Sequence, residues 1–190
     1  MLNLQKNDVL DLTKKNPGLK NVVLAVGWDV VKKGFFSFQE DYDLDLVALL
    51  LDKDGRVSGK NSLIYFGNQR GTGIFLHGDN RTGEGDGDDE KISVSLDRIP
   101  SSCEKIVFAV TIYQADRRKQ SFSKVKNAYV RLLDEDSRNS ELCRYNLTDD
   151  GGDNTAIVFA ELSRDNDDWK FKAVGELMKA SVSTLFERYK

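Results

Sequence analysis

The stretch Ile106-Val-Phe-Ala-Val-Thr-Ile112 decides the fold class, and Val22-Val-Leu-Ala-Val26 repeats its pattern. Both stretches are apolar on either side of the chain and rich in β-branched residues, which is typical of strands that are covered on both faces. Working outward, short runs bounded by Gly, Asn, Asp or Ser predict further strands at residues 43–51, 62–66, 73–76, 92–96, 128–133, 142–147 and 155–162. Many short strands separated by turns are typical of a sandwich, so we expect a mainly all-β fold, a β-sandwich.

The end of the chain follows a different period. Apolar residues recur there at spacings of three and four, which predicts a C-terminal amphipathic helix that packs on the sheets. These residues are Val174, Leu177, Met178, Val182, Leu185, Phe186 and Tyr189. The polar side of this helix is too weakly basic for a helix that lies on a membrane. No internal repeat or flexible linker marks a boundary, so we expect residues 1–190 to form a single domain.

The composition argues against several classes of protein. The chain has 190 residues, with 28 Lys and Arg against 31 Asp and Glu and a net charge of −3. This balance argues against a nucleic-acid binder and against a disordered acidic tail. The longest apolar run, Leu46 to Leu51, is far shorter than the roughly 20 residues that span a bilayer, so no membrane span is expected.

Two further features bear on the cellular compartment. The first eight residues contain no apolar stretch of signal-peptide length, so we expect a cytoplasmic protein. Cys103 and Cys143 lack both CxxC spacing and a cluster of His residues. We therefore expect buried or half-buried free thiols rather than a redox or zinc site.

The segment His77–Glu90 concentrates negative charge between two predicted strands. Its carboxylates are Asp79, Glu84, Asp86, Asp88, Asp89 and Glu90. Like charges so close together repel and raise one another's pKa, and a hard cation would relieve the repulsion. Calcium takes six to eight oxygen ligands, and the interspersed Gly83, Gly85 and Gly87 would let backbone carbonyls turn inward. We expect one or two Ca²⁺ ions, with Mg²⁺ a weaker candidate and an ordinary solvated turn the alternative.

The calcium site predicted here is not an EF-hand. An EF-hand loop has twelve residues, and the matching window here would run from Asp79 to Glu90. Its third, fifth and sixth positions are Arg81, Gly83 and Glu84, where the motif needs Asp or Asn, Asp or Asn, and Gly. A single loop seldom completes a calcium shell, so a second source of oxygen is expected. Asp43 and Asp45 share a strand face with apolar residues, and Asp29 ends another strand. The alternative for each of them is an acid at a strand end that faces water.

Several motifs together resemble the TerD-type proteins of bacterial tellurite resistance and general stress response. They are Gly27-Trp28-Asp29, Tyr42-Asp43-Leu44-Asp45 and the glycine-rich acidic run Gly78–Glu90, followed in order by segments beginning at Phe122, Leu142 and Trp169. The likeness covers nearly the whole chain. It implies one TerD-like calcium-binding β-sandwich domain, cytoplasmic and non-enzymatic, encoded among membrane-associated stress proteins.

The same resemblance implies a set of metal ligands. Matched by motif, these are Asp43, Asp45, Asp79, Asn80, Asp86, Asp88, Asp89 and Glu90, with Asp29 a looser transfer. Leu46 departs from the family pattern, which often has a small residue there. We expect no catalytic residue and no organic cofactor.

Three functions follow from these observations. The first is a calcium-binding, metal-gated adaptor in tellurite and chemical stress resistance, whose partners are other stress or tellurite-resistance proteins, some of them membrane-associated. The alternative is a calcium-dependent module that binds a membrane surface, for which Arg81, Lys91 and Phe75 give thin support. A metal-dependent hydrolase is less supported, because no nucleophile with an adjacent base is visible, and His77 is expected to form a structural hydrogen bond. Neither nucleic acid nor a small-molecule substrate is expected as a partner.

Overall fold

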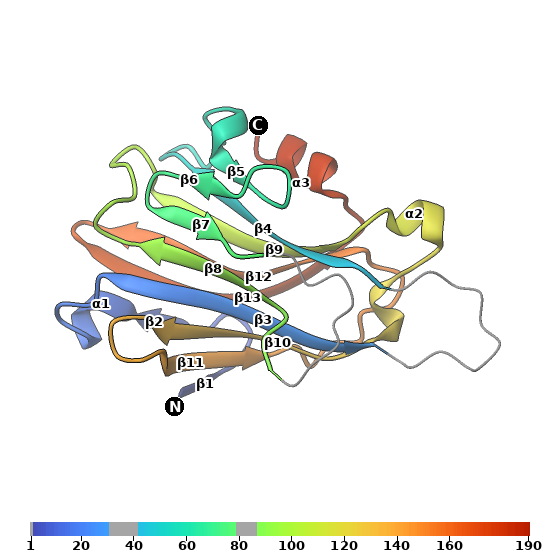
Figure 1. The fold of residues 1–190 in the computed structure, drawn as a ribbon, viewed down its shortest axis with the longest axis horizontal. Coiled ribbons are helices and arrows are strands. Elements are labelled where there is room, and N and C mark those ends of the chain that lie inside the picture. Colours follow the sequence, from blue (N-terminus) through green and yellow to red (C-terminus); the bar gives the residue numbers. More distant parts are fainter. Residues whose placement is uncertain (1, 31–41, 79–86) are drawn as a thin grey trace.

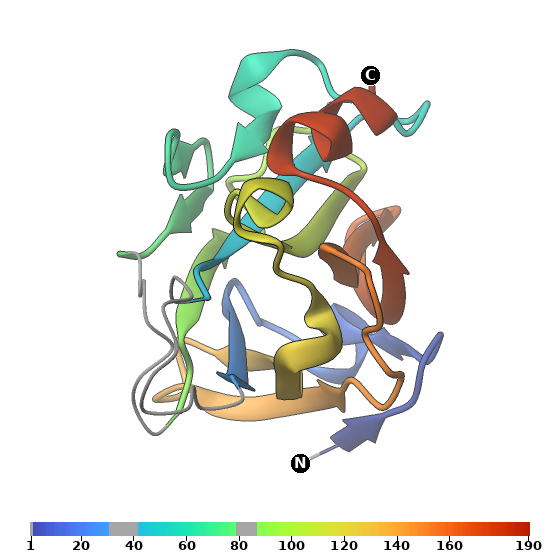
Figure 2. The same cartoon turned by 90° about the vertical axis from the view of Figure 1, so that its right-hand side faces the viewer.

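The computed structural model describes residues 2–30, 42–78 and 87–190, which form two sheets packed face to face (Figure 1, Figure 2). Within these ranges, sheet A has seven strands in the order β1-β11-β10-β3-β8-β7-β6, and sheet B has six in the order β2-β13-β12-β9-β4-β5. Neighbouring strands run antiparallel there, except for the parallel pair β1 and β11. The predicted β-sandwich is confirmed.

The elements have the following bounds. Sheet A consists of β1 (Leu2–Leu4), β11 (Ser140–Asn146), β10 (Val125–Asp134), β3 (Asn21–Val30), β8 (Glu90–Ser95), β7 (Ile74–Leu76) and β6 (Arg70–Gly71). Sheet B consists of β2 (Val9–Asp11), β13 (Asp168–Met178), β12 (Ala156–Asp165), β9 (Lys105–Ile112), β4 (Leu44–Leu51) and β5 (Leu63–Ile64). The helical elements are α1 (Leu12–Lys15), η1 (Lys60–Ser62), α2 (Ala115–Arg118), η2 (Phe122–Lys124) and α3 (Val182–Arg188). None of these helices is long and apolar enough to cross a membrane.

The central strands of sheet B are buried on both faces, as their sequence predicts. On β4, Leu46 and Ala48 face the space between the sheets, whereas Val47 and Leu49 pack on the other face. That outer face is covered by α3, whose Leu185 joins the same apolar cluster (Figure 2). Because neither face meets water, these strands lack the alternation of polar and apolar residues that marks a half-exposed strand.

The prediction of one long C-terminal helix is wrong in its first half. Val174, Leu177 and Met178 belong to β13, and the helix α3 begins only at Val182, where Ser181 caps it and forms a capping box with Thr184. Val174 and Met178 nevertheless pack in the same cluster as α3. Apolar residues of a strand and of the helix that follows it therefore meet on one surface, and their spacing along the chain imitates a single helix.

The predicted strands are otherwise found, with shifted ends. Among the strands of the described residues, four were not expected. Three of them, β1, β2 and β6, have only two or three residues each, which is too few to show an alternation of apolar and polar residues. The fourth is β13, which the helical spacing obscured.

Cys103 and Cys143 are buried free thiols, as expected. Burial raises the pKa of Cys103 to about 11 and that of Cys143 to about 12, so the reactive thiolate is scarce in the folded chain.

We expect neither thiol of the native protein to react with a disulfide reagent at about pH 8, while both react in denaturant. A cysteine introduced at the exposed Ser183 is the control that reacts at once, and fast reaction of the native thiols would contradict the burial.

Candidate metal-binding site

Six of the nine predicted metal ligands lie within the described residues, and the structure brings them to one end of the sandwich. They are Asp29 at the end of β3, Asp43 and Asp45 at the start of β4, and Asp88, Asp89 and Glu90 at the start of β8. Asp79, Asn80 and Asp86 lie outside the described residues. Of the acidic run, the structure therefore describes the end, residues 87–90.

Asp89 ties the start of β8 to the end of β3. Its backbone N–H donates to the carbonyl of Val26 at 2.8 Å, and its Oδ2 accepts a hydrogen bond from the backbone N–H of Trp28 at 2.8 Å. The side chain is buried, with 8% of the residue exposed. Burial raises the pKa of Asp89, the bond from Trp28 opposes the change, and the charges of Asp29 and Asp88 raise the pKa further. A buried acid with two acidic neighbours is an electrostatically unfavourable arrangement that a bound cation would relieve.

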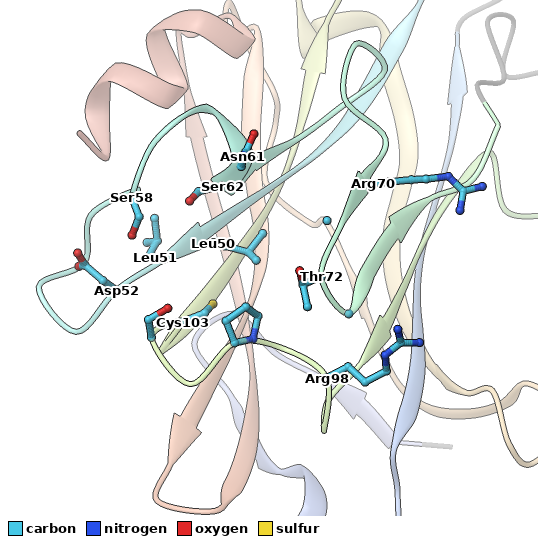
Figure 3. Close-up of a pocket in the computed structure, with 14 residues that line it drawn as sticks. Leu50, Leu51, Asp52, Ser58, Asn61, Ser62, Arg70, Thr72, Arg98 and Cys103 are labelled. Atoms are coloured by element: carbon cyan, nitrogen blue, oxygen red, sulfur yellow. The ribbon is translucent and has the colours of Figure 1, made fainter.

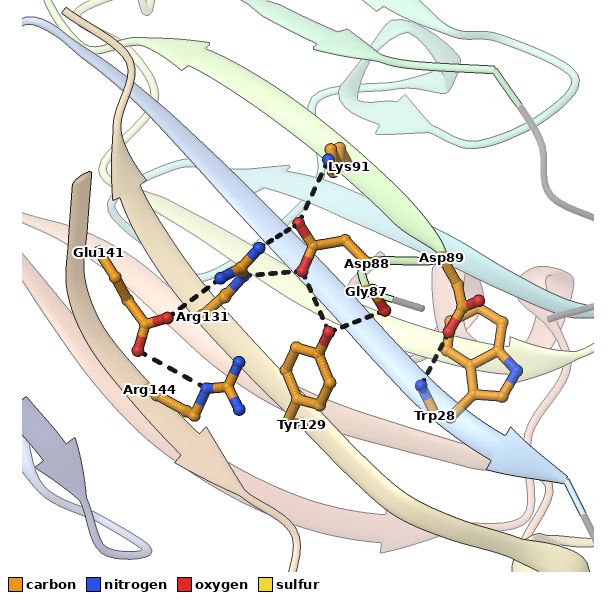
Figure 4. Close-up of polar contacts among 9 residues, drawn as sticks. All are labelled: Trp28, Gly87, Asp88, Asp89, Lys91, Tyr129, Arg131, Glu141 and Arg144. Atoms are coloured by element: carbon orange, nitrogen blue, oxygen red, sulfur yellow. Dashed lines mark hydrogen bonds and ion pairs between the residues drawn. The ribbon is translucent and has the colours of Figure 1, made fainter. Parts of the chain in front are cut away.

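Asp88 is held in an ion pair on the outer face of sheet A, as Figure 4 shows. Arg131 of β10 donates from Nε and Nη2 to its two carboxylate oxygens at 2.7 and 2.8 Å, and Lys91 lies 3.2 Å away. The side chain of Asp88 is only 1% exposed. Burial alone would raise the pKa of Asp88, but the hydrogen bonds and charges of Arg131 and Lys91 outweigh burial and lower it. Both oxygens of this predicted ligand are thus engaged by cations of the chain itself.

Tyr129 reinforces this anchor. Its hydroxyl donates to the carbonyl of Gly87 at 2.9 Å and lies 3.1 Å from Oδ1 of Asp88. Burial, with the neighbouring charge of Asp88, raises the pKa of Tyr129 to about 12, so the hydroxyl remains a donor. The aromatic ring lies over Gly27, where a Cβ atom would collide with it. Gly27 is therefore required by the close approach of Tyr129.

The network continues along sheet A through Glu141 and Arg144 (Figure 4). Arg131 also donates from Nη1 to Glu141 at 3.2 Å, and the other oxygen of Glu141 lies 3.6 Å from Nε of Arg144. The guanidinium of Arg144 stacks over the Tyr129 ring at 4.2 Å. The sequence did not single out these residues, because isolated charges on the exposed side of a strand are common and only the strand register brings them to Asp88.

Glu90 joins the two sheets. It faces the interior with 3% of the residue exposed, and its Oε2 accepts a hydrogen bond from the backbone N–H of Leu46 at 2.5 Å. The pairing of β5 with β4 reaches only Ala48, so the amide of Leu46 lies beyond the end of β5. The carboxylate of Glu90 supplies the acceptor that a longer β5 would have supplied.

The remaining acids face in different directions. Asp43 and Asp45 lie on the outer face of sheet B, in line with Val47 and Leu49, as the alternation along the strand predicts. Asp45 is 4% exposed, and Asp43 Oδ2 lies 4.0 Å from Nη1 of Arg118. Asp29 lies in line with the outer face of sheet A, where it accepts a hydrogen bond from Asn127 at 2.6 Å. Across residues 2–30, 42–78 and 87–190, no three potential metal ligands form one group.

His77 has the structural role that was expected. Its Nε2 lies 2.8 Å from the hydroxyl of Ser93, and its ring contacts Phe75 edge-on.

At the other end of β4, Leu50 and Cys103 border a cavity of about 610 Å³ (Figure 3). Arg70 and Arg98 extend away from Cys103 in that view, and the Arg70 guanidinium stacks on Phe75 at 4.2 Å. This arrangement does not converge on an anion.

The type of donor atom at the acidic end suits a hard cation such as calcium, although the described residues there do not form a group of three ligands. The side chains that the structure gathers there offer carboxylate oxygen rather than sulfur or imidazole, and hard cations prefer such ligands. The charge of Asp29 contributes to the raised pKa of Asp89. Asp88 and Glu90 are committed to Arg131 and to the Leu46 amide, respectively.

The fold and the acids together define a class of protein, a β-sandwich with carboxylate side chains at one end. The TerD domain model matches residues 1–189, and the chain belongs to the TerD domain family. It is 41% identical over 190 residues to Tellurium resistance protein TerD of Serratia marcescens, covering 99% of this chain and 96% of that protein. It is 40% identical over 190 residues to General stress protein 16U of Bacillus subtilis (strain 168), with the same coverage of each.

A solved structure has the same fold. The crystal structure of a homologue of telluride resistance protein (TerD) from Streptomyces coelicolor A3(2) superposes with a TM-score of 0.70 at 26% identity. The match covers 89% of this chain and 95% of that one. The resemblance inferred from the motifs is therefore confirmed. The relatives are named as resistance or stress proteins and not as enzymes.

The anchor of Asp88 can be tested by removing its main partner. Arg131→Met leaves a carboxylate that is 1% exposed with only Lys91 as a counter-charge, and we expect a loss of about 3 kcal/mol in the free energy of unfolding. Adding Asp88→Asn to this variant should recover part of the loss. The control is Arg144→Met, whose side chain stacks on Tyr129, with an expected loss below about 1 kcal/mol. Equal losses in urea denaturation for the two arginines would contradict the assignment.

Gly27 provides an independent test. Gly27→Ala places a methyl group against the Tyr129 ring and should displace its hydroxyl from Gly87 and Asp88, at a cost of about 1–3 kcal/mol. Gly78→Ala is the matched control, because a Cβ atom there meets nothing within 4 Å, and its effect should stay within about 0.5 kcal/mol. Thermal unfolding of both variants measures the difference. An unperturbed Gly27→Ala variant would contradict the close approach.

Proposed function

We propose that this protein is a calcium-binding stress-response protein that acts as a metal-gated adaptor in resistance to tellurite and other chemical stress. The names of its relatives support the stress role. The observation that carries the calcium proposal is the burial of Asp89 at the fixed end of the acidic segment, with Asp29 and Asp88 beside it. The names of the relatives describe resistance or stress proteins and no enzyme, which supports a non-catalytic protein, and we propose that it is cytoplasmic.

The acids have different roles in this proposal. Asp29 and Asp89 would hold the ion together with Asp79, Asn80 and Asp86, while Asp43 and Asp45 would contribute from sheet B. Asp88 and Glu90 would act as positioning residues, because Arg131 and the Leu46 amide already engage them. When bound, calcium supplies positive charge that screens neighbouring carboxylates from one another. The chain itself supplies a rigid frame, since β8 is fixed to β3 through Asp89 and to β4 through Glu90.

Gating follows from electrostatics. Without a cation, the carboxylates between Asp79 and Glu90 repel one another, and the segment gains little from any single arrangement. With the cation, one compact arrangement becomes favourable and presents a defined surface on which a partner protein can dock. Binding to the folded state alone would add about 2.7 kcal/mol of stability at a hundredfold excess of calcium over Kd.

The proposal is tested by calorimetric titration of metal-stripped protein with calcium and then with magnesium. We expect calcium to bind more tightly than magnesium, and Asp89→Asn to weaken calcium by about tenfold or more, which is about 1.4 kcal/mol. Asp52→Asn is the matched control, because Asp52 lies in the turn at the other end of β4. No calcium heat in the wild-type protein, or the same heat in Asp89→Asn, would contradict the proposal.

Co-sedimentation with vesicles distinguishes the adaptor function from the membrane-binding alternative. Sedimentation with anionic vesicles, with and without calcium, should leave this protein in the supernatant in both conditions. Calcium-dependent pelleting would instead favour the membrane-surface module.

A further inference from the structure

The cavity that Leu50 and Cys103 border is lined largely by polar side chains (Figure 3). Its volume of about 610 Å³ lies within the range of small-molecule sites. Three segments of the chain meet around it, namely residues 58–62, the turn between β6 and β7 at residues 71–73, and residues 98–103. The sequence analysis did not predict a ligand here, because only the fold brings these segments together.

The fold holds the walls of this cavity in place. Arg164 of β12 donates from Nε to the carbonyl of Cys103 at 2.9 Å and from Nη2 to that of Ile99 at 2.8 Å, which fixes the turn between them. Gly73 has a φ of 74°, and a Cβ atom there would lie 2.8 Å from the backbone of Arg98. The turn between β6 and β7 therefore packs directly on this segment. Walls that are already ordered lose little conformational entropy when a ligand binds.

Many polar side chains of the walls are not used by the protein itself. They form no hydrogen bond or ion pair with the part of the chain that the structure describes. An apolar ligand would cover them without replacing their hydrogen bonds to water, which is unfavourable. The cavity therefore favours a ligand that forms hydrogen bonds. The side chains are the hydroxyls of Ser58, Ser62, Thr72 and Ser102, the carboxamide of Asn61 and the guanidinium of Arg98.

The charges at this cavity favour an uncharged ligand. Asp52 and Arg98 border it with opposite charges, while the guanidinium of Arg70 is engaged by stacking on an aromatic ring. Leu50 and Pro100 add apolar surface between the polar groups. A hydroxyl group both donates and accepts hydrogen bonds, so a ligand that carries several of them matches both the donors and the acceptors of the walls.

We propose that this cavity binds an uncharged molecule with several hydroxyl groups on one ring. Its hydroxyls would pair with those of the walls and with Asn61 and Arg98, and the C–H groups of the ring would pack on Leu50 and Pro100. A hard cation suits the cavity poorly, because no three potential metal ligands form one group in the described residues. The proposal goes beyond the calcium-binding function and does not depend on it.

The probe for this site is myo-inositol, with cyclohexanol as its matched control. Both have the same carbon ring, which is fully hydroxylated in the first and carries a single hydroxyl in the second. Each is titrated into metal-stripped protein in the presence of a calcium chelator, and amide chemical shifts are followed by NMR. We expect myo-inositol to shift the amides of residues 58–62, 71–73 and 98–103, with a Kd of about 1 mM, and to bind about tenfold more tightly than cyclohexanol. Equal binding of the two, or no shifts in these segments at tens of millimolar inositol, would overturn the proposal.

Deleting single hydroxyls locates the ligand. Ser102→Ala and Thr72→Val each remove an exposed hydroxyl that lines the cavity, so the fold should persist while the affinity for myo-inositol falls about threefold or more. Ser101→Ala is the matched control, because Ser101 is equally exposed and does not line the cavity. The calcium titration should stay unchanged in all three variants. If Ser102→Ala and Thr72→Val bind myo-inositol as the wild type does, or if Ser101→Ala loses as much affinity, the proposed cavity is not the binding site, whatever the calcium result.

Discussion

The bidentate ion pair between Asp88 and Arg131 is the interaction on which the acidic end depends. A carboxylate that is 1% exposed requires a counter-charge, and Arg131 supplies it from the neighbouring part of sheet A. The pair fixes the point at which the acidic segment returns to β8, and Tyr129 fixes the residue before it through the Gly87 carbonyl. The segment from Asp79 onward therefore ends on a rigid support, whatever arrangement it takes.

The acids at this end differ in what surrounds each carboxylate. Asp88 neutralises Arg131, and Glu90 satisfies an amide that the short strand β5 leaves beyond its end. These roles need no metal. The side chain of Asp89 accepts a backbone hydrogen bond from Trp28, while burial and its acidic neighbours raise its pKa and make its ionised form less favourable. The pKa of Asp88 is lowered by its cations, whereas that of Asp89 is raised, and this difference is why we assign positioning to Asp88 and metal binding to Asp89.

The fold could largely be predicted because strand periodicity is local. The apolar stretches around Val22 and Ile106 indicated doubly covered strands, and β3 and β9 are such strands. The long helix failed because Val174 and Met178 reach the α3 cluster by tertiary packing, which local spacing cannot distinguish from a helical stripe. Likewise, the acidic motif located the candidate site, but the partner of Asp88 could not be found from spacing. Arg131 is 43 residues away, and only the register of β8, β3 and β10 brings the two together.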